Sequence, residues 1–201
     1  MIKFENTEIC GIGHAIRGMR NAMNSWDKSD SYIDERYNTV HIGENDKSLM
    51  KRLFNAGTDH RKYLRMITVY ADITAPLYWW KEYDTYKVGT VANSCSTMHT
   101  IHKRRLTLDD FSIDNYERCY YVDILCNLNT LIDNYKKTND IKYFRILVGL
   151  LPSSFNQKRT VMLNYEVLAN IYKSRQGHKL KEWKRFIGWI ETLPYNDLIR
   201  G

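Results

Sequence analysis

Residues 63–99 read YLRMITVYADITAPLYWWKEYDTYKVGTVANSCSTMH and combine a strand pattern, an aromatic helix pattern and a polar loop. From Tyr63 to Ile73, β-branched and aromatic side chains alternate with a period of two, which predicts a strand buried on at least one face. We expect Thr74 to cap a following helix, with Pro76 in its first turn, because a first-turn N–H has no partner within the helix.

This helix is expected to be buried because it carries a large aromatic surface. Its apolar and aromatic members are Leu77, Tyr78, Trp79, Trp80 and Tyr83. A loop of small, hydroxyl and amide residues follows from Thr85 to Thr97. Two interpretations of this loop stay open, a ligand-binding cradle and an ordinary surface loop.

Composition predicts a folded globule, since 43% of the 201 residues are hydrophobic and 13% are aromatic. A chain of this length forms one domain with a substantial core, or one subunit of an oligomer. No apolar run approaches the roughly 18–20 residues that a membrane span needs. The first ten residues, MIKFENTEIC, do not resemble a signal peptide. We therefore expect a cytoplasmic protein with no membrane partner.

The net charge of +7 suits an anionic partner, either a nucleic acid or a phosphorylated small molecule. The basic run Lys103–Arg105 is short and has no interleaved aromatic residues, so a solvated face is favoured over a nucleic-acid patch. The four cysteines show neither CxxC pairing nor zinc spacing, and no metal site is predicted. Cys119 and Cys126 lie one heptad apart, which favours packing in the core.

The rest of the chain contains further expected strands and several helices, and the fold class expected for the whole chain is α+β. Expected strands are Ile2–Ile9 and Phe155–Leu163, and expected helices are His14–Met23, Lys47–Ala56 capped by Asp46, Asp114–Lys137, Ile141–Leu150 capped by Asp140, Tyr165–Arg175 capped by Asn164, and Lys179–Leu193. The segment Asn24–Asn45 is polar and is the least predictable. The apolar helix Ile141–Leu150 is expected to be buried, and a sister subunit is a second surface that it could face.

The strand, the Ala75-Pro76 pair and the loop resemble the signature region of the flavin-dependent thymidylate synthase (ThyX) family. In that family an Arg-His-Arg triplet is followed after seven residues by a serine at a shared nucleotide and flavin site. This chain has Thr85-Tyr86-Lys87 at the triplet, followed by Cys95 and Ser96. His60 stands where the family pattern has a Gly-His ahead of the core strand.

The C-terminal third extends the resemblance, which covers about Lys47–Ile190. Leu151-Pro152 fits the family's Leu-Pro, Asn164 and Asn170 are six apart like the two flavin-contacting asparagines, and Arg175 fits a nucleotide-contacting arginine. The resemblance implies a single domain over residues 1–201, a small twisted sheet wrapped by helices, and a homotetramer with sites between subunits.

The same resemblance implies the site residues. The nucleotide would contact Glu82, Thr85, Lys87, Asn93, Cys95, Ser96 and Arg175, and FAD would contact His60, Tyr86, Asn164 and Asn170. Catalytic residues are not assigned. A nucleophilic role for Cys95 requires a neighbouring base or cation, which the sequence does not place.

Three departures from the family pattern bear on function. Val148 and Glu166 stand where the pattern has arginines, and Tyr86 replaces the signature histidine. Lys87 keeps a positive charge but lacks the bidentate geometry of arginine. The leading hypothesis is a flavin-dependent enzyme that transfers a methyl or one-carbon group to C5 of a pyrimidine deoxynucleotide. The alternative is a non-catalytic protein of this fold that binds or sequesters a nucleotide, and a phage-encoded setting would suit either.

Overall fold

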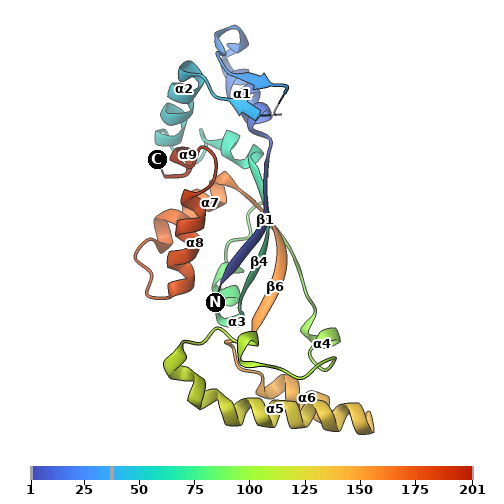
Figure 1. Cartoon of the computed structure of the whole chain (residues 1–201). Helices are drawn as coiled ribbons and strands as arrows, with labels where there is room; N and C mark the ends of the chain where they lie inside the picture. The colour runs from blue at the N-terminus through green and yellow to red at the C-terminus, as the bar shows by residue number, and fades with distance from the viewer. Residues whose placement is uncertain (1, 37–38, 201) are drawn as a thin grey trace. The chain divides into compact units, whose positions relative to one another are not determined.

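The structure, a computed structural model that describes residues 2–36 and 39–200, is an α+β fold with two small sheets (Figure 1). The four-stranded sheet has the order β1-β4-β6-β5, and β2 pairs with β3 in a separate antiparallel ribbon with Tyr32 opposite His41. The strands are β1 (Lys3–Cys10), β2 (Tyr32–Asp34), β3 (Thr39–His41), β4 (Thr68–Pro76), β5 (Val91–Ser94) and β6 (Asn156–Asn164).

The helices that the described residues form lie between these strands and after the last of them. They are α1 (Ile12–Arg20), α2 (Glu44–Asn55), α3 (Leu77–Tyr83), α4 (Thr97–Thr100), α5 (Arg118–Thr138), α6 (Ile141–Leu150), α7 (Tyr165–Arg175), α8 (Lys181–Glu191) and α9 (Asp197–Arg200). Short 3-10 turns lie at η1 (Asn21–Met23), η2 (Trp26–Lys28), η3 (Lys62–Met66), η4 (Leu108–Asp110) and η5 (Asn115–Glu117). Over the described ranges, no helix has the length and apolar character needed to cross a bilayer.

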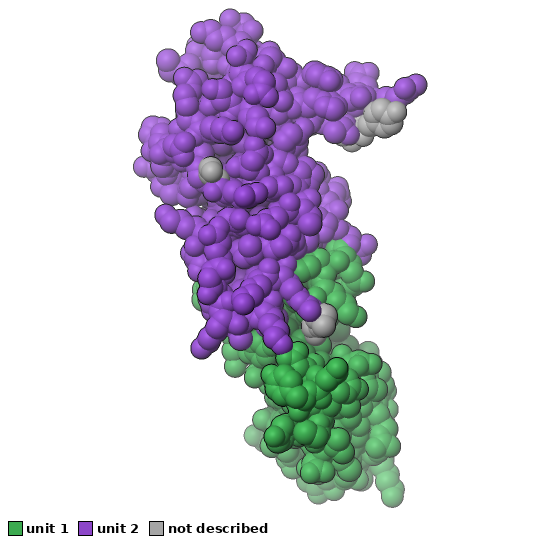
Figure 2. All heavy atoms as spheres, turned by 60° about the vertical axis from the view of Figure 1, so that its left-hand side comes forward, with its two compact units in different colours: residues 1–5, 72–85, 92–160 green, residues 6–71, 86–91, 161–201 purple. Residues whose placement is uncertain are grey.

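The chain forms two compact units, coloured separately in Figure 2. Unit 1 contains residues 1–5, 72–85 and 92–160, and unit 2 contains residues 6–71, 86–91 and 161–201. Strands β1, β4, β5 and β6 each contain residues of both units.

Unit 1 has a core beside the packed pair α5 and α6, which lie side by side in Figure 1. Its buried members are Ile101, Leu106, Phe111, Leu128, Ile132, Phe144 and Leu147. The buried Asn129 side chain accepts a hydrogen bond from the Leu106 N–H at 2.7 Å and donates one to the Leu106 carbonyl at 3.0 Å. As predicted, α6 begins at an Asp140 cap, whose carboxylate accepts from the Lys142 N–H at 3.0 Å.

Unit 2 is organised around α7, which packs against α8, α9 and η3. The buried apolar and aromatic side chains of α7 and α8 are Tyr165, Val167, Leu168, Ala169, Ile171 and Tyr172 from α7 and Trp183, Phe186, Trp189 and Ile190 from α8. The Tyr165 hydroxyl donates to the Pro194 carbonyl, which ties α7 to the segment ahead of α9. The bounds predicted for α7 are confirmed.

The first part of the predicted strand 63–73 is wrong. Residues 62–66 form η3, in which Tyr63 and Leu64 are both buried. The Tyr63 hydroxyl donates to the Met50 carbonyl at 2.9 Å, a partner that a strand pattern does not reveal. From Ile67 onward the predicted alternation is confirmed, with every second residue through Ala75 buried.

The predicted Thr74 cap is also wrong, because Thr74 lies within β4 and α3 begins after Pro76. Backbone carbonyls replace the expected side-chain cap. The Leu77 N–H donates to the Phe155 carbonyl at 3.0 Å, and the Tyr78 N–H donates to the Ser153 carbonyl at 2.9 Å.

Two further expectations are corrected by burial. Cys119 and Cys126 are exposed rather than packed in the core. Ile146 and Leu150 of α6 are 46% and 58% exposed, because α6 turns only one face, with Phe144 and Leu147, toward the core of unit 1. The cap of α2 differs too: Asp46 lies inside the helix, and Asp30 accepts from the Asn45 N–H at 2.9 Å.

Candidate functional site

The predicted site residues divide between the two units. Unit 2 holds His60, Tyr86, Lys87, Asn164, Asn170 and Arg175, and unit 1 holds Glu82, Thr85, Asn93, Cys95 and Ser96. Within unit 2, three polar arrangements gather around α7.

The first arrangement joins the start of α7 to the turn at residues 86–91. Asn164 is 3% exposed, and its Oδ1 accepts from the Val167 N–H at 2.9 Å, which caps the helix. Its Nδ2 donates to the carbonyls of Val88 at 3.3 Å and Gly89 at 3.2 Å. Gly89 has φ +68°, and a Cβ there would lie 2.9 Å from Nδ2. The turn therefore favours glycine at position 89, and both the oxygen and the nitrogen of the Asn164 amide are bonded within the unit.

The second arrangement surrounds Arg175 at the end of α7. Its Nε donates to the Tyr86 hydroxyl at 2.9 Å. The guanidinium carbon lies 4.6 Å from the Trp183 ring centroid and 5.6 Å from the Tyr86 ring centroid. Arg175, predicted to contact the nucleotide, and Tyr86, predicted to contact the flavin, therefore lie together although 89 positions separate them in the sequence. Trp183 is fully buried, and sequence reasoning missed its contact with the Arg175 guanidinium.

The third arrangement balances the reversed charge at Glu166. This side chain is buried, and an Arg61 Nε lies 2.9 Å from its Oε2. The Arg61 Nη2 also donates to Asn170 Oδ1 at 3.2 Å. Sequence reasoning missed Arg61, although a buried carboxylate requires a positive partner and Arg61 directly follows His60. His60, Asn170 and Lys87 are exposed.

In unit 1, the predicted residues follow α3 and β5. The Thr85 hydroxyl donates to the Glu82 carbonyl at 2.7 Å, which ends α3 in a tight turn. Asn93 is exposed on β5, and Ser96 precedes α4, where its carbonyl accepts from the Thr100 hydroxyl at 2.7 Å. These contacts involve the backbone around the predicted residues, and the predicted contacts of their side chains with a nucleotide stay predictions.

Cys95 lines a pocket of about 370 Å³ in unit 1 together with Lys3, Arg104 and Lys158. Its backbone N–H donates to the Lys158 carbonyl at 2.8 Å, and its thiol lies 3.9 Å from the Thr100 hydroxyl. Lys158 and Arg104 are paired with acidic side chains. Over residues 2–36 and 39–200, no imidazole or carboxylate is bonded to the thiol, so the structure does not supply the base that a Cys95 nucleophile needs.

A further cation of unit 1, Arg159, was not singled out in the sequence. Its guanidinium lies 4.2 Å from the Trp80 ring centroid, donates to Asp84 at 2.8 Å and donates to Gln157 at 3.0 Å. All three partners hold the arginine in place, and its role in unit 1 is therefore to join α3 to β6.

Comparison with known proteins shows similarity in structure alone. No family model matches the sequence, and no curated protein matches it. Two solved structures of ThyX from Helicobacter pylori with FAD and dUMP are similar, one with TM-score 0.76 and 17% identity over 98% of both chains, the other with 0.75 and 16% over 100% of both. A UMP/dUMP methylase, PolB from Streptomyces cacaoi, bound with 5-Br dUMP, has TM-score 0.62 and 10% identity over 96% of this chain and 88% of that one.

Proposed function

We propose that this chain, which has the fold of the flavin-dependent thymidylate synthases, binds a pyrimidine deoxynucleotide and FAD and transfers a methyl or one-carbon group to the nucleotide at C5. The observation that carries the proposal is the pairing of Arg175 with Tyr86. Two positions chosen from separate parts of the sequence pattern meet at 2.9 Å in unit 2, beside a turn held by a third, Asn164.

For the nucleotide, we assign phosphate binding to Arg175 and Lys87. Arg175 is preorganised by Tyr86 and Trp183, so less side-chain entropy is lost when it binds an anion. Lys87 is exposed in the adjoining turn and adds a second positive charge. Val148 cannot bind a phosphate, so we expect the contact to rest on fewer cations than the family pattern supplies.

For the flavin, the residues of unit 2 fit the group in part. His60 and Asn170 are exposed and offer an imidazole and an amide, which suit the hydrogen-bonding ring edges of a flavin, whereas Arg61 is paired with Glu166. Asn164 and Tyr86 are bonded within the unit, and we assign them positioning roles. When bound, the flavin would supply the reducing power, while the protein binds and orients the nucleotide.

A second candidate, a protein of this fold that binds a nucleotide without turnover, is favoured by the Arg61–Glu166 pair. The Glu166 carboxylate neutralises the positive charge of Arg61, and it stands where the family pattern has an arginine. For both candidate functions we also propose that residues 1–201 form a single domain and that the protein is a homotetramer. The match over nearly the whole of the ThyX chains supports the single domain.

The first experiment records the visible absorbance of the purified protein and identifies by mass spectrometry the molecules released on denaturation. Near-stoichiometric flavin supports the enzyme. His60→Ala should then lower the flavin content, whereas Thr58→Ala, an exposed change in the same turn, should not. A colourless protein that releases a nucleotide favours the second candidate.

Nucleotide binding is tested by calorimetry with dUMP. Arg175→Ala should weaken binding at least tenfold, while Lys173→Ala, which removes an exposed cation from the same helix, serves as the matched control. Release of tritium from C5-labelled dUMP then separates the candidates. Equal dUMP affinity in the Arg175→Ala and wild-type proteins would remove Arg175 from the site and leave the proposal without its main support.

A further inference from the structure

A hollow in unit 2 lies apart from every predicted site residue. It has a volume of about 440 Å³ and is lined by Ile16, Arg17, Arg20, Trp26 and Ser29. Ligand pockets commonly measure about 300–1,000 Å³ and combine apolar surface with a few polar groups. The size and the mixed lining therefore suit a small molecule.

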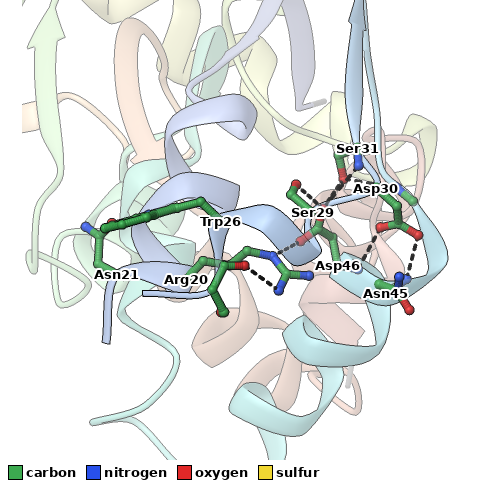
Figure 3. A network of polar contacts seen from close by, with 10 residues as sticks. Arg20, Asn21, Trp26, Ser29, Asp30, Ser31, Asn45 and Asp46 are labelled. Atoms are coloured by element: carbon green, nitrogen blue, oxygen red, sulfur yellow. Dashed lines mark hydrogen bonds and ion pairs between the residues drawn. The ribbon is translucent and has the colours of Figure 1, made fainter. Parts of the chain in front are cut away.

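One wall of the hollow is an aromatic ring held in a fixed position. Trp26 is 51% exposed, and its indole N–H donates to Asn21 Oδ1 at 2.9 Å (Figure 3). The hydrogen bond satisfies the polar edge of the ring and leaves its apolar surface half exposed. When a planar ring stacks on this surface, little conformational entropy is lost, because the Trp26 side chain is already held in position.

A second part of the lining is held by a buried ion pair, also drawn in Figure 3. Arg20 Nε donates to Asp46 Oδ1 at 2.6 Å, and Arg20 Nη1 donates to the Ser25 carbonyl at 3.1 Å. The Ser29 and Ser31 hydroxyls each donate to Asp46 Oδ2 at 2.6 Å. Asp46 therefore neutralises Arg20, which shapes the hollow but adds no net charge to it.

Arg17 supplies the net positive charge. It is exposed, and among the residues that the structure describes none accepts a hydrogen bond from its guanidinium. It also lines a second hollow of about 550 Å³, whose other lining residues include residues 11–13 and His14. The anionic part of a ligand stacked on Trp26 would therefore meet Arg17.

We propose that this hollow, defined by Arg17 and Trp26, is a second ligand site that takes a planar aromatic anion such as a nucleotide. The ring stacks on Trp26, over the buried Ile16, and the phosphate or carboxylate pairs with Arg17. The proposal is independent of the function assigned to α7, because none of the residues involved belongs to that arrangement.

The test is calorimetry of the full chain with AMP, UMP and FMN as probes, in both the wild-type and the Arg175→Ala protein. Binding of at least one probe should persist in Arg175→Ala. Arg17→Gln and Trp26→Leu should each weaken that binding at least tenfold, and Lys28→Gln, an exposed cation on the same turn as Trp26, should leave it within twofold.

Matched ligands identify the two halves of the site. Adenosine and inorganic phosphate should each bind more weakly than AMP if AMP is the probe that binds. Circular dichroism confirms that the variants fold. Binding of no probe, or affinities unchanged by Arg17→Gln and Trp26→Leu, would overturn the second site, whereas loss of dUMP binding in Arg175→Ala bears only on the first.

Discussion

Removal of Arg61 tests whether the reversed charge at Glu166 is stabilised in the way the structure indicates. Arg61→Ala leaves a carboxylate that is 4% exposed without the cation that lies 2.9 Å away. Breaking a buried ion pair by removing one partner costs about 3–5 kcal/mol. Arg61 itself is 14% exposed, so water partly replaces it, and we expect the lower end, about 3 kcal/mol.

Smaller losses accompany the broken pair. The guanidinium lies 4.9 Å from the Phe54 ring centroid and donates to Asn170 at 3.2 Å. These contacts contribute about 0.5–1 kcal/mol and about 1 kcal/mol, respectively. The expected total for Arg61→Ala is therefore about 5 kcal/mol in the free energy of unfolding.

Urea denaturation followed by far-ultraviolet circular dichroism measures this value, with an unchanged m as the check that the unfolded state is the same. The matched control is Arg61→Met with Glu166→Met, which removes both charges at similar volume and should stay within about 1.5 kcal/mol of wild type. A cost below about 1 kcal/mol for Arg61→Ala would be typical of a solvated pair and would refute the reasoning.

Three other changes have defined outcomes. Burial raises the pKa of Asp46, but hydrogen bonds from Ser29, Ser31 and Arg20 outweigh it and hold the pKa below its ordinary value. The stability that Asp46 provides is therefore fully present above its unfolded pKa of about 4 and is lost as the pH falls through the lower pKa of the folded state. Urea titrations of wild type and Asp46→Asn should therefore converge in acid. Gly89→Ala should cost at least about 1 kcal/mol in urea denaturation, because of its positive φ and the contact at 2.9 Å; no loss would mean that the turn adapts. Asp140→Ala should cost about 1 kcal/mol through the lost cap of α6, whereas Asp140→Asn should cost less.

The parts of the fold that could be predicted are those decided by neighbours in sequence. The bounds of α7 and α6 were correct because each combines a side-chain cap with apolar residues at helical spacing. The alternation in β4 was correct from Ile67, where burial of every second residue imposes it. The fold class and the resemblance to ThyX enzymes also agree with the structure, as the two similar ThyX structures show.

The parts that could not be predicted depend on partners far apart in the chain. Arg61 and Glu166 are separated by 105 positions, and Arg20 and Asp46 by 26, so neither pairing leaves a local pattern. The same holds for η3, in which the Tyr63 hydroxyl donates to the Met50 carbonyl in α2, a contact that the strand pattern around Tyr63 does not reveal. The predicted roles of the site residues in ligand binding remain predictions.

Asn164 restricts which sequences this fold can tolerate. The start of α7 requires an acceptor at this position, and the turn at Gly89 requires two donors from the same side chain. Aspartate would keep the cap but place a carboxylate against two carbonyl oxygens, serine would be too short to reach the turn, and glutamine would be too long to cap. Only a short carboxamide meets both demands, so a single side chain at position 164 joins the start of α7 to the turn that precedes β5.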